Sequence, residues 1–371
     1  MTREEVTEEI LKISNNNILI EIPTGFGKTK IALELIKKRA KSNSKILIVI
    51  PKNVLINNWL EEIKKWLPAY KLDITFTTYV SFPKYANKWD IVIFDECHHL
   101  SNRCLESLKS YTITYNILLS ATIKQDNKWE IQKAFPYLYI YHVSIRAAID
   151  NAILPDPKII LIPMELDNIH KTELAGVIKD NKKYYCTPKK YYEIISNNID
   201  FWKKKALGGN AACKNIWLHK AGERLKWLSK QKTPIIANIL KKLAYKKTLT
   251  FCNNIQQAEY LSKNYIHSKN NNNAQLLEAF NNNKIKHLTS VAMLDEGINL
   301  KNCQVGIYAN LNSSERIIKQ RLGRLLRHKN PVIIIPYFIN TRDEEIMKQM
   351  LLDYNHNLIS ILNNIELLKK I

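Results

Sequence analysis

The first 150 residues alternate short apolar runs with segments of helical periodicity. Residues 30–41 and 54–66 repeat apolar positions every three to four residues, as amphipathic helices do. The runs predicted to be buried strands are residues 18–22, 46–50, 91–95 and 116–120. Alternation of this kind predicts a parallel sheet covered by helices.

The alternation stops near Asp150 and resumes about a hundred residues later. Predicted strands of the later region are residues 248–252, 286–291, 304–308 and 332–335. The chain is therefore expected to be an α/β protein with two parallel-sheet domains in tandem. The expected boundaries are 1–150 for the first domain, 151–232 for a linker and a mainly helical insert, 233–340 for the second domain and 341–371 for a C-terminal helical segment.

Charge singles out the insert. The formal net charge of the 371 residues is +22, and residues 179–247 hold 18 Lys or Arg against 4 Asp or Glu, a net charge of +14. An excess of this size indicates an anionic partner such as nucleic acid. The runs of Asn and the abundant Lys and Ile also fit an A/T-rich coding sequence, which raises the lysine content without any role in binding.

Other compositional features exclude several classes of protein. The six cysteines lack CxxC spacing, so neither a disulfide framework nor a zinc site is predicted. The acidic amino terminus does not resemble an export signal, and no apolar run is long enough to span a bilayer. The expected location is the cytoplasm, or a host's cytoplasm if a phage encodes the chain, with no membrane partner and no requirement for an oligomer.

A phosphate-binding loop is predicted between the first strand and the first long helix. Pro23-Thr24-Gly25-Phe26-Gly27-Lys28-Thr29 has the glycines that let backbone N–H groups converge on phosphate oxygens, at the positive end of a helix. Ile22 stands where the strict GxxxxGK[ST] pattern has its first glycine. Lys28 is expected to reach the β- and γ-phosphates of ATP, and the Thr29 hydroxyl to bind Mg²⁺.

A pair of carboxylates follows the third predicted strand. Asp95-Glu96-Cys97-His98-His99 begins at the strand's carboxyl end, where open α/β sheets collect their ligands. Asp95 is expected to hold the metal, and Glu96 to act as the general base on water. A zinc cluster is the alternative, but adjacent histidines rarely converge on one ion.

The phosphate loop, the Asp95-Glu96-Cys97-His98 box and Ser120-Ala121-Thr122, taken in this order, resemble the superfamily 2 helicases of the DExH type, a DEAD/DEAH-like group. The resemblance implies two RecA-like domains. It also implies that His98, Ser120 and Thr122 couple hydrolysis to domain closure. By the same resemblance Ile50-Pro51-Lys52 and Thr77-Thr78-Tyr79 contact the nucleic-acid backbone, although both segments can equally be plain loops.

The second domain carries the other half of the resemblance. Gln320-Arg321-Leu322-Gly323-Arg324-Leu325-Leu326-Arg327 is similar to the arginine-finger motif, and the i, i+3 spacing sets Arg324 and Arg327 on one helical face. Gln320 belongs to the same catalytic motif. The run from Ser290 through Gly297 to Asn299 resembles the motif that links ATP to nucleic acid, with Asn299 where many relatives have Asp.

The insert interleaves lysines with aromatic residues. Lys182-Lys183-Tyr184-Tyr185 and Phe201-Trp202-Lys203-Lys204-Lys205 are two of these runs. Aromatic faces stack on unpaired bases while ammonium groups follow the phosphates, so the insert is expected to hold a nucleic-acid strand. The alternative is a small helical insert with the rings in its core and the lysines in solvent, and the two interpretations are compatible.

The sequence thus predicts an ATP- and Mg²⁺-dependent helicase whose hydrolysis is stimulated by nucleic acid, with DNA favoured over RNA. Two alternatives stay open: a translocase or remodeller that acts on double strands without unwinding them, and a nucleotide-gated clamp with slow turnover. The chain has no glutamine before Gln125, although many relatives recognise adenine through a glutamine upstream of the phosphate loop. Loose base selectivity, or recognition through Arg3, is therefore expected.

Overall fold

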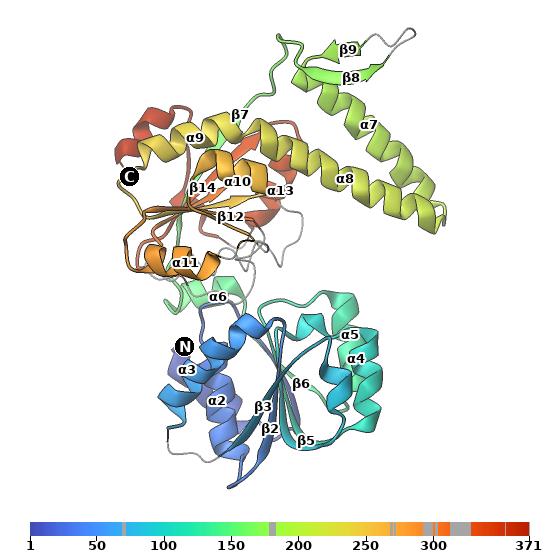
Figure 1. Ribbon diagram of the computed structural model, residues 1–371, viewed down its shortest axis with the longest axis vertical. Coiled ribbons are helices and arrows are strands. Elements are labelled where there is room, and N and C mark those ends of the chain that lie inside the picture. Colours follow the sequence, from blue (N-terminus) through green and yellow to red (C-terminus); the bar gives the residue numbers. More distant parts are fainter. Residues whose placement is uncertain are drawn as a thin grey trace. The chain divides into compact units, whose positions relative to one another are not determined.

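The computed structural model describes residues 1–68, 72–177, 183–267, 270, 272–291, 300, 303–311, 328–352 and 354–370. The chain divides into two compact units. The first has its body in residues 1–156, and the second begins at Pro157. Each unit is built around its own parallel sheet (Figure 1); the second is drawn in orange to red except for the green strand β7.

Among its described residues the first unit has a six-stranded sheet with strand order β3-β2-β4-β5-β1-β6, and all its pairings are parallel. The four strands predicted for this region are all present. Sequence patterns did not indicate β3 and β6, which carry more polar residues. The elements are α1 (Arg3–Lys12), β1 (Asn17–Glu21), α2 (Lys28–Arg39), β2 (Lys45–Ile50), α3 (Ile56–Trp66), β3 (Asp73–Thr78), β4 (Lys88–Asp95), α4 (Asn102–Ser107), β5 (Thr112–Ser120), α5 (Gln125–Ala134), β6 (Tyr139–His142) and α6 (Ile145–Asp150).

Helices cover both faces of this sheet, with α2 and α3 on one side and α4 and α5 on the other (Figure 1). Alternate residues of each central strand therefore face different layers. Val92 and Phe94 of β4 belong to a buried cluster that also includes Phe135, while Ile93 between them is fully buried outside that cluster. Burial on both faces explains why these strands are continuous apolar runs without polar alternation.

The strand order also determines where the polar loops of the first unit lie. Strand β2 lies between β3 and β4, and β5 lies between β4 and β1. Because the strands are parallel, their carboxyl ends meet at one edge of the sheet. The phosphate loop after β1 and the acidic box after β4 consequently share that edge.

Among its described residues the second unit has a seven-stranded parallel sheet with strand order β11-β12-β10-β13-β14-β7-β15. Its elements are β7 (Lys158–Met164), β8 (Glu173–Val177), β9 (Lys183–Cys186), α7 (Pro188–Leu207), α8 (Ala211–Gln231), α9 (Thr233–Lys242), β10 (Thr248–Cys252), α10 (Ile255–Leu261), β11 (Tyr265–Ile266), α11 (Asn273–Asn281), β12 (His287–Val291), β13 (Val305–Tyr308), β14 (Val332–Phe338), α13 (Arg342–Met350) and β15 (Ile359–Ile361).

Two segments of this unit differ from the sequence-based expectation. Strand β7 matches a strand-like run at residues 159–164 that the sequence places in the linker and insert, but it belongs to the second sheet, where it pairs in parallel with β14 over its whole length. The C-terminal segment begins with helix α13 as expected, but β15 then adds a short strand beside β7. An edge strand offers unpaired backbone groups, so even the exposed Ile359–Ile361 run gains hydrogen bonds by pairing there.

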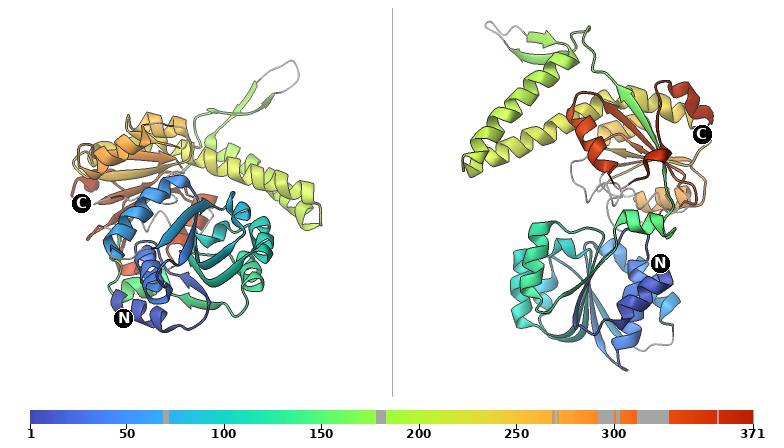
Figure 2. Two further views of the ribbon diagram at one scale, coloured as in Figure 1. Left: turned by 60° about the horizontal axis from the view of Figure 1, so that its bottom comes forward. Right: turned by 180° about the vertical axis from the view of Figure 1, so that it is seen from behind.

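Helices α7 and α8 run side by side as a long hairpin that extends from the second sheet (Figures 1 and 2). The antiparallel pair β8 and β9 precedes it. We call this α7–α8 pair the arm. Its turn lies at Gly208-Gly209-Asn210, where Gly209 has a φ of +93° and the Asn210 side chain caps α8.

A buried polar network fixes the root of the arm to the second sheet. The Ser229 hydroxyl, near the end of α8, donates to the Ala309 carbonyl, and Gln257 of α10 donates to the Ser229 carbonyl at 2.7 Å. Beside it, Lys232 Nζ pairs with Asp343 Oδ2 at 2.8 Å, and both side chains are at most 1% exposed. Buried groups paired in this way hold one geometry, because any displacement leaves a desolvated partner unpaired.

All six cysteines are free and buried. Within the described ranges, no helix is both long and apolar enough to cross a membrane.

Candidate active site

The phosphate loop joins β1 to α2 through two glycines in the left-handed region. Gly25 has a φ of +90° and Gly27 a φ of +111°, conformations that glycine adopts without a steric penalty. Gly27 is also the N-cap of α2, and no side chain caps that helix end. The first N–H groups of α2 therefore face the loop as donors, and the helix dipole adds positive charge there.

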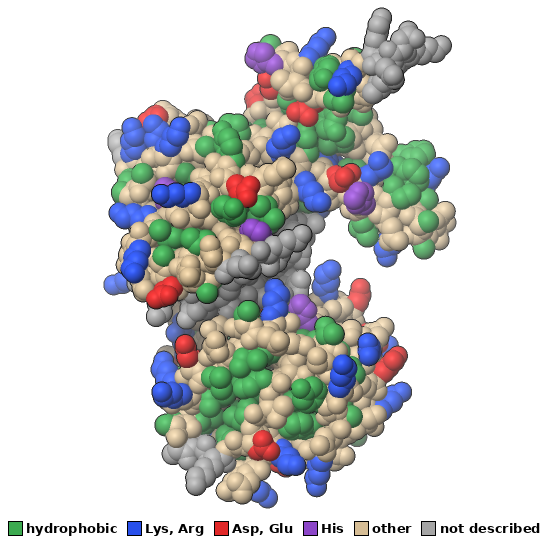
Figure 3. Space-filling view, viewed as in Figure 1, with side chains coloured by type: hydrophobic (Ala, Val, Ile, Leu, Met, Phe, Trp, Pro, Cys, Tyr) green, Lys and Arg blue, Asp and Glu red, His purple; other side chains and the backbone are tan. Residues whose placement is uncertain are grey.

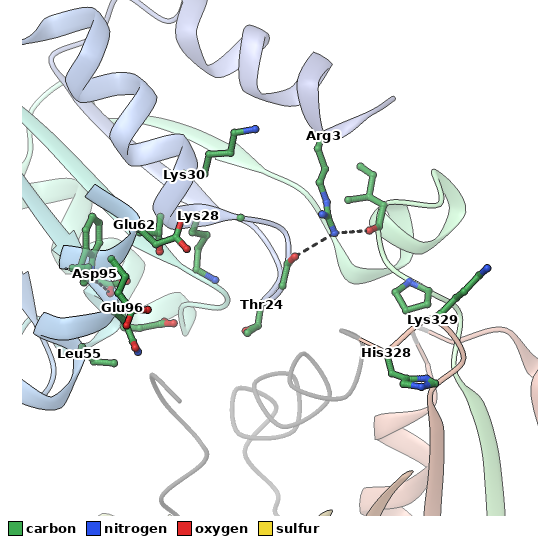
Figure 4. Close-up of a pocket in the computed structure, with 18 of the residues that line it drawn as sticks. Arg3, Thr24, Lys28, Lys30, Leu55, Glu62, Asp95, Glu96, His328 and Lys329 are labelled. Atoms are coloured by element: carbon green, nitrogen blue, oxygen red, sulfur yellow. Dashed lines mark hydrogen bonds between the residues drawn. The ribbon is translucent and has the colours of Figure 1, made fainter. Parts of the chain in front are cut away.

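Two cations lie beside this loop. Lys28 Nζ donates to the Ile22 carbonyl at 3.2 Å, so its ammonium group is folded back against the loop. Arg3 of α1 donates through Nη2 to the Gly25 carbonyl at 3.4 Å and to the Ile153 carbonyl at 2.9 Å (Figure 4). Arg3 therefore joins the loop to the segment that ends the first unit.

Asp95 ends β4 and is held from two sides. The indole of Trp59 on α3 donates through Nε1 to Asp95 Oδ2 at 3.0 Å. The phenol of Tyr79 donates to the Asp95 backbone carbonyl at 2.7 Å. Burial and the charge of Glu96 raise the pKa of the Asp95 carboxyl to about 6, while the Trp59 hydrogen bond and Lys28 act in the opposite direction. This carboxylate is consequently poised to gain stability from a cation.

Glu96 takes a left-handed backbone conformation, with a φ of +52°. Its Oε2 lies 3.4 Å from His98 Nδ1, and the same nitrogen lies 3.1 Å from Ser120 Oγ. Ser120 donates to the Thr122 carbonyl at 3.0 Å, and its own carbonyl accepts from Ile22 N at 3.1 Å. The three predicted motifs of the first domain are thus joined by direct hydrogen bonds.

The phosphate loop, Trp59, Asp95 and Glu96 line one cavity of about 740 Å³ in the first unit. Thr24, Lys28, Asp95 and Glu96 all border it (Figure 4), and Thr29 at the start of α2 also lines it. Thr24 Oγ1 and Glu96 Oε2 are buried and have no hydrogen-bond partner among the described residues. The volume of the cavity, the N–H donors at the start of α2 and these two oxygens together suit a nucleotide whose phosphates lie toward Lys28.

The segments expected to contact nucleic acid occupy the same sheet edge. Pro51 and Lys52 follow β2, and Lys52 is exposed. Thr78 ends β3, and its Oγ1 lies within hydrogen-bond distance of the Ser81 hydroxyl, at 3.5 Å. Both segments are accessible enough to contact a strand.

Two side chains predicted to contact nucleic acid are instead buried. Tyr79 is 6% exposed, because its ring packs in the core while its hydroxyl holds the Asp95 carbonyl. Ser290 on β12 is 1% exposed. Neither side chain is accessible in this structure, and their assignment to the nucleic-acid contacts stays a prediction. The aromatic ring of Tyr79 is more stable in the apolar layer than at the surface.

Five predicted site residues lie outside the described residues: Gly297, Asn299, Gln320, Arg324 and Arg327. Sequence analysis also missed a residue of the first unit. Trp59 has no place in the motifs, and only its position on the apolar face of an amphipathic helix indicated burial. A lone Trp on such a face gives no information about the partner of its N–H group.

Two protein-family models match the chain. The model described as the res subunit of type III restriction enzymes matches residues 2–125. The model of the helicase conserved C-terminal domain matches residues 231–329. The two matches cover the regions that hold the phosphate loop with the acidic box and the Gln320–Arg327 motif.

Relatives and solved structures agree with these matches. A DNA 3'-5' translocase, XPB2 of Sulfurisphaera tokodaii, is 25% identical over 84% of this chain and 75% of the relative. Putative helicase 22 of a Sulfolobus islandicus filamentous virus is 24% identical over 84% of this chain and 58% of the relative. The structure of Saccharomyces cerevisiae Dbp5 bound to RNA and ADP BeF3 aligns with a TM-score of 0.65 at 12% identity, over 99% of this chain and 92% of that one.

Proposed function

We propose that this chain, which is a protein of helicase superfamily 2, hydrolyses ATP in order to translocate along DNA or to separate its strands. The observation that carries the proposal is the cavity in which the phosphate loop, Asp95 and Glu96 meet. Superfamily 2 proteins with this constellation are nucleic-acid-stimulated ATPases. The DNA translocase among the relatives supports DNA as the partner.

The predicted site residues take complementary roles in the proposed reaction. Lys28 releases the Ile22 carbonyl and binds the β- and γ-phosphates, together with the N–H groups at the start of α2. Glu96 orients the attacking water and accepts its proton. Arg324 and Arg327 neutralise the charge that develops on the γ-phosphate, and Gln320 assists from the same motif. Gly297 and Asn299 complete the nucleotide contacts of the second domain.

Mg²⁺ fits the oxygen ligands present at this edge. Thr29 offers a hydroxyl and Asp95 a carboxylate, and Mg²⁺ prefers one or two such ligands together with substrate phosphates. Burial and the neighbouring Glu96 raise the pKa of Asp95, and a cation bound there would favour its charged form. When bound, Mg²⁺ polarises the phosphates and offsets the charge of the transition state.

Glu96 lies at ion-pair distance from His98, His98 hydrogen-bonds with Ser120, and Ser120 donates to the Thr122 carbonyl, which together support the proposed coupling of hydrolysis to domain closure. Loss of the γ-phosphate changes the charge beside Glu96. His98 responds to that change directly, because its Nδ1 contacts both the Glu96 carboxylate and the Ser120 hydroxyl. Lys52, Pro51 and Thr78 then hold or release the strand.

The nucleic-acid partner is tested by a panel of ATPase measurements. Single-stranded DNA, duplex DNA, branched DNA and RNA are added in turn to the full chain at saturating Mg²⁺ and ATP. We expect the largest stimulation with DNA. Stimulation by RNA alone would contradict the DNA assignment.

Strand displacement and triplex displacement separate the two kinds of motor. A helicase separates a duplex next to a single-stranded tail, whereas a double-strand translocase displaces only the third strand of a triplex. ATP-dependent binding without turnover would favour the clamp instead. Glu96 argues against the clamp, because a binding module has no need of a general base.

Base selectivity gives a further prediction. The described residues around Arg3 offer the cavity a guanidinium group and backbone carbonyls, and no glutamine side chain. We expect the kcat/KM values for GTP, CTP and UTP to lie within about tenfold of the value for ATP, the discrimination that one neutral hydrogen bond supplies. Steady-state hydrolysis of the four nucleotides measures this, and strict preference for ATP would contradict it.

The arm is the proposed source of much of the salt-dependent affinity. At its root, the rings of Tyr191 and Trp227 pack together at 5.3 Å, and the Trp227 indole donates to Glu173, so these rings belong to the arm's core. At its tip, Phe201 is 50% exposed and Lys205 lies over its ring at 4.5 Å. Figure 3 shows apolar side chains gathered on the surface of this unit among lysines and arginines. The tip therefore combines accessible rings with positive charge, as single-strand binding requires.

Neutralising the tip is expected to flatten the salt dependence of binding. Lys203, Lys204 and Lys205 are all exposed, and each phosphate contact adds about 0.7 to the slope of log K against log salt for a single strand. The triple Lys→Gln variant should lower the slope by up to about 2. Fluorescence anisotropy with oligo(dT) at several salt concentrations measures it.

The matched control neutralises three exposed lysines at or near the amino ends of the first sheet's strands, Lys84, Lys88 and Lys109. It changes the net charge equally and should leave the slope close to that of the wild type. Equal slopes of log K against log salt for the tip variant and the wild type would show that the tip of the arm does not contact the strand.

A further inference from the structure

The two segments of the first unit that are proposed to contact nucleic acid are each connected to Asp95 by a short path. Lys52 lies just before the helical turn Asn53–Leu55 that leads into α3, and α3 carries Trp59. Thr78 is the residue before Tyr79. Trp59, on the helix that follows Lys52, and Tyr79, next to Thr78, both donate a hydrogen bond to Asp95.

Both donors are built into the core, so neither is a chance surface contact. Trp59 is 2% exposed and Tyr79 is 6% exposed. Burial raises the pKa of Tyr79, so its phenol keeps the proton that it donates. The turn after Thr78 is closed by a hydrogen bond from Ser81 N to the Thr78 carbonyl at 3.0 Å, which ties the segment to the ring. A displacement of either segment must therefore move a donor on Asp95.

The two donors control different parts of Asp95. Trp59 orients the carboxylate by holding Oδ2, which leaves the other oxygen for the cavity. Tyr79 fixes the backbone carbonyl of Asp95 and thus the start of the turn that presents Glu96. Trp59 thus orients the Asp95 carboxylate that is proposed to hold Mg²⁺. Tyr79 fixes the position of the backbone that carries Glu96, the proposed general base.

We propose that Trp59 and Tyr79 are positioning residues that transmit the binding of a nucleic-acid strand at Lys52 and Thr78 to Asp95 and Glu96. This inference rests on the proposed function, because it names the route by which a strand stimulates the same site. Strand binding shifts the start of α3 and the turn after β3, and the two hydrogen bonds carry that shift to the acidic box.

The test removes each donor and leaves an aromatic ring in its place: Trp59→Phe replaces the indole by a smaller phenyl ring, and Tyr79→Phe removes only the hydroxyl. The quantity measured is the ratio of kcat with saturating oligo(dT) to kcat without it. We expect this ratio to fall about tenfold or more in Trp59→Phe, which loses a hydrogen bond to a charged group, and about two- to tenfold in Tyr79→Phe. Affinity for oligo(dT), measured by anisotropy, should stay at the wild-type value.

Two core residues of the same unit supply matched controls. Trp89 donates to the Tyr85 carbonyl at 3.1 Å, and Tyr111 donates to the Phe82 carbonyl. Trp89→Phe and Tyr111→Phe remove the same chemical groups away from Asp95, and both should keep the stimulation ratio of the wild type. If stimulated and unstimulated rates fall by one common factor in the Trp59 and Tyr79 variants, the two residues only support the fold and the inference is overturned.

A second readout needs neither nucleotide nor metal. The chain has seven Trp residues, and 5-fluorotryptophan labelling gives a ¹⁹F resonance for each, with Trp59 assigned by its loss in Trp59→Phe. Adding oligo(dT) should shift the Trp59 resonance in the wild type and shift it less in Lys52→Ala. A Trp59 resonance that does not respond to bound oligo(dT) contradicts the inference, whereas a wild type without any stimulation by nucleic acid contradicts the proposed function itself.

Discussion

Replacing Glu96 by glutamine is expected to lower the kcat for ATP hydrolysis by about 10²- to 10⁴-fold, the usual contribution of a general base. The amide keeps the shape of the side chain but cannot accept a proton from water. The affinity for ATP should be retained, because Lys28 and the start of α2 carry the phosphate contacts. Steady-state turnover and equilibrium binding of a fluorescent ATP analogue measure the two quantities.

Glu62→Gln is the matched control for this substitution. Glu62 lines the same cavity, but its Oε2 accepts the Trp66 indole at 2.8 Å and so serves the packing of α3. This variant should keep kcat within about tenfold of the wild type, since it loses at most one hydrogen bond to a charged group. A Glu96→Gln variant as active as the Glu62→Gln variant would show that another residue activates the water.

Removing the guanidinium group of Arg324 is expected to have an effect of similar or larger size. An arginine finger stabilises charge that exists only in the transition state, and its loss costs about 10³- to 10⁵-fold in kcat. Arg324→Ala should therefore abolish turnover almost entirely while ATP still binds. The same two measurements, turnover and equilibrium binding, separate loss of chemistry from loss of affinity.

Lys319→Ala is the control for Arg324, because it removes a positive charge directly before the motif, five residues from Arg324. On a helix that spacing turns the side chain well away from the Arg324 and Arg327 face. The control should leave kcat near the wild-type value. Equal losses in both variants would mean that the segment contributes only general positive potential.

Local patterns were sufficient to predict the central strands of both sheets and the sheet edge on which the polar residues gather. The runs at residues 46–50 and 248–252 are buried on both faces, and continuous apolar stretches bounded by polar loops mark such strands. The phosphate loop could be predicted equally well, because its glycines are needed for φ values that other residues avoid. These features depend on neighbours along the chain.

Features that depend on contacts between residues far apart in the sequence could not be predicted from local patterns. Strand β7 joins the second sheet by pairing with β14, about 170 residues later, and no local pattern encodes that register. The Trp59 contact with Asp95 joins residues 36 positions apart. The burial of Tyr79 was not predicted, because a tyrosine after a strand is equally suited to a surface contact and to a core. Only the packed structure distinguishes these uses.

The division of the insert into a structural root and an accessible tip also depends on contacts between distant residues, so local patterns did not predict it. The sequence showed rings and lysines in alternation but not which rings face each other. Tyr191 and Trp227 lie 36 positions apart and meet only because α7 and α8 form a hairpin. Phe201 stays exposed because it lies near the turn, where the two helices end.

The central claim is that strand binding and ATP hydrolysis are linked through the single cavity that holds Lys28, Asp95 and Glu96. The most direct test is the steady-state ATPase rate of the wild type and of Lys28→Ala, each with and without single-stranded DNA. We predict Mg²⁺-dependent turnover that DNA stimulates in the wild type, and no measurable turnover in Lys28→Ala under either condition. Turnover that persists in Lys28→Ala, or a wild-type rate that is indifferent to every nucleic acid, would contradict the account.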